Sequence, residues 1–234
     1  AVANAFFDQD GIQVVILYPS GKVSGLQEKQ LTTMGGNITA LEVDGNFDDC
    51  QRLVKQAFAD RELNLDINLT SANSINFARL FPQSFFYFNA VAQLEPSDKN
   101  IVFSVPSGNF GNLTSGLIAK KMGLPVHRFI ASTNRNRVVP DYLSSGNYLP
   151  KQTHHTITNA MDVGDPSNFP RMLEIYGKQH SAMASNIDGY WFTDDETRSA
   201  MAILQNKYTY QADPHGAVAF AGLLKSGLLA VNTG

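Results

Sequence analysis

The sequence predicts an α/β protein with two open parallel-sheet domains that carry helices on both faces. Short apolar runs alternate along the chain with segments of helical periodicity, which is typical of parallel strands joined by crossover helices. The runs at 12–18 and 101–106 are continuous and rich in β-branched residues. Such runs indicate buried strands, and we expect the first to be buried on both faces.

Residues 1–75 form the smaller predicted domain. A strand is expected at 63–70, where apolar and polar residues alternate. The other expected elements are a helix over 1–7, the strand over 12–18, a helix over 24–34, a strand over 37–43 and a helix over 47–61.

Residues 76–234 form the larger predicted domain. Its first helix is predicted over 75–94 and so begins one residue before the domain boundary. We expect the aromatic side chains of that helix, Phe81, Phe85, Phe86, Tyr87 and Phe88, to pack in the core. Residues 138–155 are predicted to be rich in loop. The other expected elements are strands at 101–106 and 125–132 and helices at 113–121, 172–176, 194–207 and 217–225.

Two of these helices carry clear start signals. Thr193 followed three residues later by Glu196 predicts a capping box, which gives that carboxylate a structural role. Asp213 followed by Pro214 predicts an N-cap and a first helical residue. His215, the next residue, could instead face a ligand.

The turn between the strand at 101–106 and the helix at 113–121 reads Ser-Gly-Asn-Phe-Gly-Asn over 107–112. Glycines 108 and 111 allow positive φ and a close backbone approach, and the N–H groups at a helix start attract anions. The turn lacks both the Gly-Lys-Ser/Thr ending of a nucleotide P-loop and the Gly-x-Gly-x-x-Gly spacing. It therefore predicts a cradle for a small phosphate, with a ligand-free turn as the alternative.

Other polar loops are predicted at the carboxyl ends of strands, where open α/β sheets bind ligands. Asn73 and Asn76 lie in one, and we favour a site role for them over simple helix capping. Arg135 and Arg137 lie in another and could pair with an anion, although solvated loop charges are commoner. Adjacent His154 and His155 lack a further ligand at metal spacing, so we interpret them as loop residues and predict no metal site.

Composition excludes several classes of partner. A net charge of −3 and a pI near 5.9 argue against nucleic acid and anionic membranes, since no basic block is present. Cys50 is the only cysteine, which suits a reducing cytoplasm.

No apolar run approaches the roughly 20 residues of a membrane span. The first residue is Ala1 and its helix lacks a cap, so we expect a fragment of a longer chain.

Taken together, the motifs resemble the threonine synthases of the pyridoxal-phosphate fold type II group, whose fold is tryptophan synthase β-like. The phosphate loop alone would indicate only the fold type, and the other motifs narrow the resemblance. The matching segments are 107–112, 73–80, 160–168 (Ala-Met-Asp-Val-Gly-Asp-Pro-Ser-Asn) and 213–217 (Asp-Pro-His-Gly-Ala).

The resemblance implies conversion of O-phosphohomoserine and water to L-threonine and phosphate, with pyridoxal 5'-phosphate as cofactor bound between the two domains. It implies that the cofactor phosphate is held by Gly108, Asn109, Phe110, Gly111 and Asn112. By the same resemblance, Asn73 or Asn76 lies near the ring hydroxyl of the cofactor.

The catalytic lysine of that family has no counterpart here. Its segment would precede Ala1, and Lys22, Lys29, Lys120 and Lys121 lie in other settings. We therefore expect this chain alone to be inactive, because lysine is the covalent anchor and the proton shuttle. Two alternatives stay open, a fold type II hydroxyamino-acid dehydratase and a noncatalytic module that binds a small phosphate.

Overall fold

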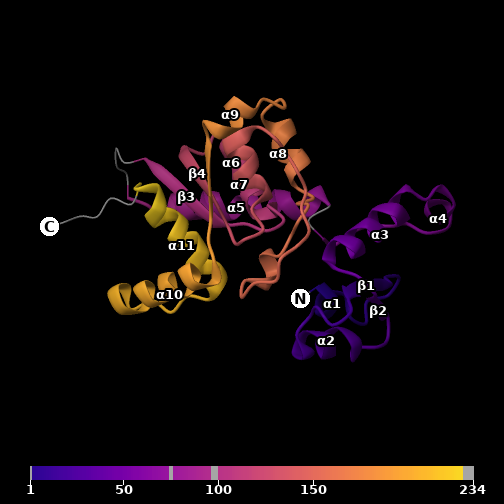
Figure 1. Cartoon of the computed structure of the whole chain (residues 1–234). Helices are drawn as coiled ribbons and strands as arrows, with labels where there is room; N and C mark the ends of the chain where they lie inside the picture. The colour runs from indigo at the N-terminus through magenta and orange to yellow at the C-terminus, as the bar shows by residue number, and fades with distance from the viewer. Residues whose placement is uncertain (1, 74–75, 96–99, 229–234) are drawn as a thin grey trace. The chain divides into compact units, whose positions relative to one another are not determined.

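The computed structural model describes residues 2–73, 76–95 and 100–228 (Figure 1). The chain divides into two compact units, Ala1–Ala72 and Asn73–Gly234. Both contain parallel strands with helices, as the predicted α/β class requires. Among the described residues, no helix combines the length and apolarity that crossing a membrane demands.

The first unit has a two-stranded parallel sheet, in which Val14 lies opposite Ile38 and Pro19 opposite Val43. Its strands are β1 (Val14–Pro19) and β2 (Ile38–Val43). Its helices are α1 (Val2–Phe6), α2 (Gly25–Thr32), α3 (Phe47–Ala59) and α4 (Arg61–Asp66). The expectation that the first strand is buried on both faces is wrong, because Val15 is 61% exposed.

The strand predicted at 63–70 is also wrong, since α4 occupies the first half of that stretch. Asp60 starts this helix by accepting hydrogen bonds from the backbone N–H groups of Glu62 (3.0 Å) and Leu63 (3.1 Å). The spacing of Leu63 and Leu65 is compatible with a strand or with a helix, because the stretch is so short. The N-cap at Asp60 favours the helix.

The second unit is built on a three-stranded parallel sheet in the order β3-β4-β5. Its strands are β3 (Ile101–Pro106), β4 (Val126–Thr133) and β5 (Ile187–Trp191). Its helices are α5 (Phe77–Ala92), α6 (Gly111–Lys121), α7 (Val138–Ser145), η1 (Asn159–Met161), α8 (Phe169–Ile175), α9 (His180–Ala184), α10 (Asp194–Tyr208) and α11 (Pro214–Ser226). The predicted helix start at residue 75 lies outside the described residues.

Four elements of this unit have no counterpart in the sequence prediction, namely α7, η1, α9 and β5. Strand β5 contains Asp188 and Gly189, residue types that are depleted in strands. Tertiary contacts explain why Asp188 and Gly189 occur in this strand. Arg128 forms a bidentate ion pair with Asp188. A Cβ at Gly189 would lie 2.8 Å from the Cα of Pro140, so glycine allows α7 to approach β5.

The loop-rich stretch predicted over 138–155 is wrong in its first part, because residues 138–145 form α7. Pro140 lies in the first turn of this helix, where no N–H is needed. Gly146 ends it in the left-handed conformation at φ 76°. The capping box at Thr193 and the N-cap at Asp213 are both confirmed, since Thr193 accepts from Glu196 and Asp213 from Gly216.

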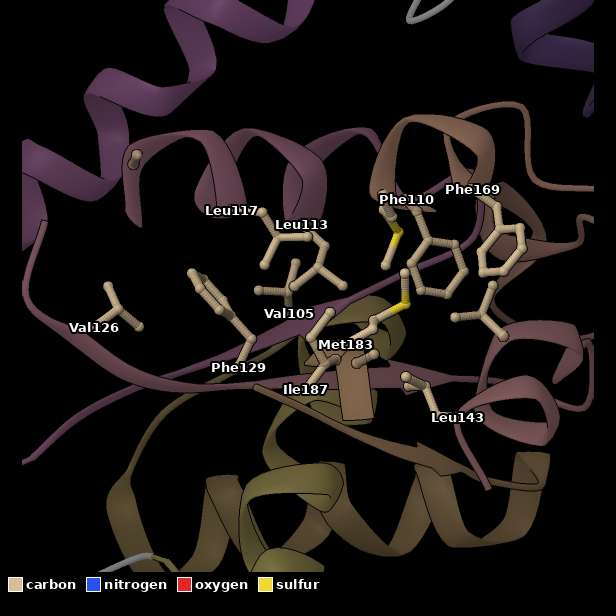
Figure 2. Close-up of a cluster of buried hydrophobic side chains, with 14 of the residues drawn as sticks. Val105, Phe110, Leu113, Leu117, Val126, Phe129, Leu143, Phe169, Met183 and Ile187 are labelled. Carbon is tan, nitrogen blue, oxygen red and sulfur yellow. The ribbon is translucent and has the colours of Figure 1, made fainter. Parts of the chain in front are cut away.

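The core of the second unit fills the space between the sheet and the helices on one face. Figure 2 shows Leu113 and Leu117 of α6 above Val105, Phe129 and Ile187 of the three strands. On the opposite face, α11 packs against β3 and β4, and a Cβ at Gly222 would collide with the Ser132 side chain. The sheet therefore carries helices on both faces.

The aromatic residues of α5 are only partly in this core. Tyr87 is buried at 4% exposure and Phe88 packs against the cluster. The prediction is wrong for Phe81, Phe85 and Phe86, which are 40%, 52% and 70% exposed. A helix that packs along one stripe buries every third or fourth residue, so consecutive aromatic residues cannot all face inward.

Close packing at Gly116 provides a test of this arrangement. A Cβ there would lie 2.7 Å from ring atoms of both Phe129 and Tyr87. We predict that Gly116→Val lowers the free energy of unfolding by about 2–3 kcal/mol through overpacking. The exposed helix substitution Gln205→Ala should change it by less than about 0.5 kcal/mol. Urea denaturation measures both values, and equal stability of the two variants would contradict the packing described.

Candidate functional site

The loop predicted to cradle a phosphate lies between the end of β3 and the start of α6. The Ser107 backbone N–H donates to the Ser132 carbonyl at 2.8 Å, which holds the loop at the carboxyl end of the sheet. Phe110 is the N-cap residue of α6 and has a left-handed backbone at φ 59°. Its side chain makes no capping hydrogen bond, so the N–H groups of this helix start are not occupied by a cap from residue 110.

Gly108 sits against the backbone of a distant segment. A Cβ at this position would lie 2.5 Å from the Cα of Met161 and 3.1 Å from the carbonyl oxygen of Ala160. Both neighbours are backbone atoms, so a larger residue would force the two segments apart. The need for glycine here comes from this close approach.

The loop forms most of a pocket of about 260 Å³. Its lining residues are Pro106, Gly108, Asn109, Phe110, Gly111, Asn112, Ala160, Met161 and His215. All five loop residues that the family resemblance implies as cofactor contacts are among them. The volume is below the roughly 300–1,000 Å³ of typical ligand sites, so it suits one group of a ligand, such as a phosphate. Among the described lining residues there is no lysine.

Asn109 ties the loop to the segment that follows Met161. Its side-chain Oδ1 accepts hydrogen bonds from the backbone N–H (2.6 Å) and the hydroxyl (2.9 Å) of Ser167. Its backbone carbonyl accepts from Nδ2 of Asn168 at 3.0 Å. Asn109 therefore has a structural role in addition to the cofactor contact that the family resemblance implies.

Asn112 connects the start of α6 to α5. The hydroxyl of Tyr87 donates to the backbone carbonyl of Asn112 at 3.0 Å and lies close to its side-chain oxygen. Burial raises the pKa of Tyr87 far above its ordinary value, so this residue stays a neutral donor.

Asn73 and Asn76 lie at the start of α5. The side chain of Asn76 accepts from the backbone N–H of Ala78 at 3.0 Å and caps the helix. Its own N–H donates to the carbonyl of Asn73 at 3.0 Å. Neither asparagine lines the pocket, and their contact with a cofactor stays a prediction.

A buried polar network holds the segment that contains Ala160 and Met161. The carboxylate of Asp162 accepts hydrogen bonds from Nδ2 of Asn134 (2.8 Å) and from the hydroxyl of Thr156 (2.8 Å). Burial raises the pKa of Asp162, and the hydrogen bonds from Thr156 and Asn134 oppose that shift. Because this network fixes the polypeptide next to Met161, it fixes one wall of the pocket.

His215 lines the same pocket, as its position in the sequence suggested. Its Nδ1 lies 2.9 Å from Oδ2 of Asp213. Ala160 and Met161, which also line this pocket, were not predicted as site residues. The cluster of turn residues between Thr156 and Arg171 was the available signal, but spatial proximity to the glycine loop cannot be read from it.

Arg135 and Arg137 line a different pocket, of about 320 Å³, together with Lys151 and Trp191. The guanidinium carbon of Arg137 lies 4.4 Å from the centre of the Trp191 ring, and its Nε lies 3.3 Å from Asp141. The structure therefore gives Arg137 partners within the protein and places neither arginine at the glycine loop. Within the described residues, no three histidine, cysteine, aspartate or glutamate side chains gather as a metal site.

Comparison with known proteins identifies the family. The model of the family described as pyridoxal-phosphate dependent enzymes matches residues 8–232. The chain belongs to this family, and its α/β architecture is that of fold type II.

Within the family, the chain is similar to threonine synthases. It is 52% identical over its whole length to the threonine synthase of Haemophilus influenzae, of which it covers 55%. It matches the crystal structure of threonine synthase from Escherichia coli with a TM-score of 0.89 and 49% identity, covering 96% of this chain and 52% of that one.

A pyridoxal-phosphate-bound threonine synthase structure from Brucella melitensis gives a TM-score of 0.81 at 35% identity, covering 95% and 53% of the two chains. The chain thus spans about half the length of the relatives it matches.

The tether at Asn109 gives a prediction that separates loop structure from anion binding. Asn109→Ala removes the acceptor for both Ser167 bonds and should lower the free energy of unfolding by about 1–2 kcal/mol. Asn109→Asp keeps both acceptors and should retain stability, but its charge should repel a phosphate. Urea denaturation and inorganic phosphate binding measured on both variants test this. Equal loss of stability in the two variants would contradict the tether.

Proposed function

We propose that the loop at 107–112 binds the phosphate of pyridoxal 5'-phosphate in a threonine synthase. The observation that carries this proposal is the pocket made by a side-chain-free backbone at Gly108, the left-handed Phe110 and the start of α6. Aligned N–H groups at a helix start favour an anion, and the dipole of the helix adds to the attraction.

The glycines and the asparagines of the loop have different roles in binding. Gly108 allows the loop to approach Met161, while Asn109 and Asn112 hold the loop through Ser167 and Tyr87. A pyridoxal phosphate cofactor supplies an electron sink for chemistry next to an amino group. The contribution of these residues is to fix the phosphate and thereby orient the cofactor.

For the complete protein we propose the conversion of O-phosphohomoserine and water to L-threonine and phosphate. Support comes from threonine synthases that are 52% and 49% identical to this chain over the stretch that aligns with it, which is about half of their own length. A threonine deaminase from Solanum lycopersicum is 15% identical, and that likeness concerns the fold alone. The dehydratase is therefore the less supported alternative.

A coupled assay distinguishes these activities. The 234-residue chain and the product of the complete open reading frame that contains it should each be given pyridoxal phosphate with O-phosphohomoserine or with L-threonine. We expect the product of the complete reading frame to release phosphate and threonine in equal amounts from the first substrate. We expect no turnover by the 234-residue chain, since no lysine lines its pocket among the described residues.

Other outcomes assign other functions. Predominant 2-oxobutyrate from L-threonine would establish the dehydratase and overturn the proposed substrate. Phosphate-ligand binding without turnover of either substrate by the complete product would favour a noncatalytic binding module. Threonine formation by the 234-residue chain would contradict its expected inactivity.

The glycine loop predicts a specific effect on cofactor affinity. Gly108→Ala should weaken pyridoxal phosphate binding by roughly 10- to 100-fold, because moving the loop away from Met161 displaces charge-assisted hydrogen bonds. Gly25→Ala is the matched control, since a Cβ there meets nothing within 4 Å. Fluorescence titration of the complete protein measures both affinities, and an unchanged affinity in Gly108→Ala would refute the cradle.

A further inference from the structure

His215 has one ring nitrogen with a partner and one without. Its Nδ1 is 2.9 Å from the carboxylate of Asp213. Its Nε2 is buried and has no hydrogen-bond partner among the described residues. A buried nitrogen without a partner is uncommon in folded proteins and calls for a ligand or a water molecule. The ring lines the pocket of the glycine loop, so a ligand in that pocket would lie beside it.

Asp213 fixes the state of the ring. One of its oxygens, Oδ1, accepts the Gly216 backbone N–H at 2.9 Å as the N-cap of α11, and the other faces Nδ1 of His215. The Gly216 N–H and the His215 ring lower the pKa of Asp213, so this carboxylate is ionised near neutral pH. An ionised carboxylate can only accept, and Nδ1 therefore carries a hydrogen.

Few charged groups lie near the His215 ring in this pocket. The other residues that line the pocket, Pro106, 108–112, Ala160 and Met161, have no titratable side chains. Asp213 is the charged group that is hydrogen-bonded to the His215 ring, and the pocket adds no second charged side chain among its described lining residues. A bound phosphate would place a second anion near the imidazole, and two anions favour the doubly protonated, cationic ring.

We propose that His215 is a binding and positioning residue for the phosphate that occupies the glycine-loop pocket, with its Nε2–H donating to a phosphate oxygen. This inference rests on the proposed function of the loop. Since Asp213 already holds the hydrogen on Nδ1, donation from both ring nitrogens requires the imidazolium form. A neutral ring would therefore take its second proton from solvent when the phosphate binds, giving an imidazolium paired with Asp213 and the phosphate.

Two substitutions distinguish the contribution of Nδ1, which faces Asp213, from that of Nε2, which would face the ligand. In His215→Asn the shorter amide can still reach Asp213 but not the ligand. In His215→Gln the amide nitrogen takes the place of Nε2 and donates without a charge. His127→Asn is the matched control, because His127 is exposed at the start of β4.

The experiment compares pyridoxal phosphate with pyridoxal, which lacks the phosphate, as ligands of the complete protein. His215→Asn should lose roughly 10- to 100-fold in affinity for pyridoxal phosphate and almost none for pyridoxal, and His215→Gln should lose less. Calorimetry in two buffers of different ionisation enthalpy should show proton uptake by the unchanged protein and by His127→Asn. That uptake should be smaller in both His215 variants.

The outcomes also separate this inference from the proposed function. If the unchanged protein does not bind pyridoxal phosphate, the proposed function of the loop fails. If the unchanged protein binds it and His215→Asn binds equally well, with the same proton uptake, His215 does not contact the phosphate. Equal losses for pyridoxal phosphate and pyridoxal would place His215 against another part of the ligand and overturn the proposal.

Discussion

The site depends on a backbone contact between Gly108 and the segment at Ala160–Met161. No side chain fits between these two stretches, which are far apart in the sequence. Their approach is maintained from both sides, because Asp162 anchors the second stretch to Asn134 and Thr156, and Asn109 binds Ser167 beyond it. The glycine loop is therefore held from outside as well as by its own sequence, which pre-organises its N–H groups for an anion.

Phe110 shows how the strain in the loop is offset. A left-handed backbone costs a non-glycine residue roughly 1–2 kcal/mol. The Phe110 side chain is 3% exposed within the core cluster, and burying a phenylalanine contributes about 1.5–3 kcal/mol. The burial is thus large enough to hold the strained backbone, and the strain itself is typical of functional sites. The same residue anchors the loop in the core and turns the start of α6 toward the pocket.

Much of the second unit follows from local sequence signals, whereas the site walls do not. Features that depend on residues close together in the sequence were predicted. They are the strands before and after α6, the capping box at Thr193 and the N-cap at Asp213. Strand β5 was not, since Asp188 is stabilised by Arg128 from another strand. Likewise, the loop at 107–112 can be identified from its glycines, but its contact with Met161 depends on tertiary packing.

The most direct test is a crystal structure of the complete protein grown with pyridoxal phosphate. The measured quantities are the distances from the phosphate oxygens to the backbone nitrogens of residues 109–112. Several distances of about 2.7–3.2 Å, the range of N–H···O hydrogen bonds, would confirm the phosphate cradle. A phosphate bound elsewhere, for example in the pocket lined by Arg137 and Lys151, with the glycine loop making no contact to it, would contradict the central claim.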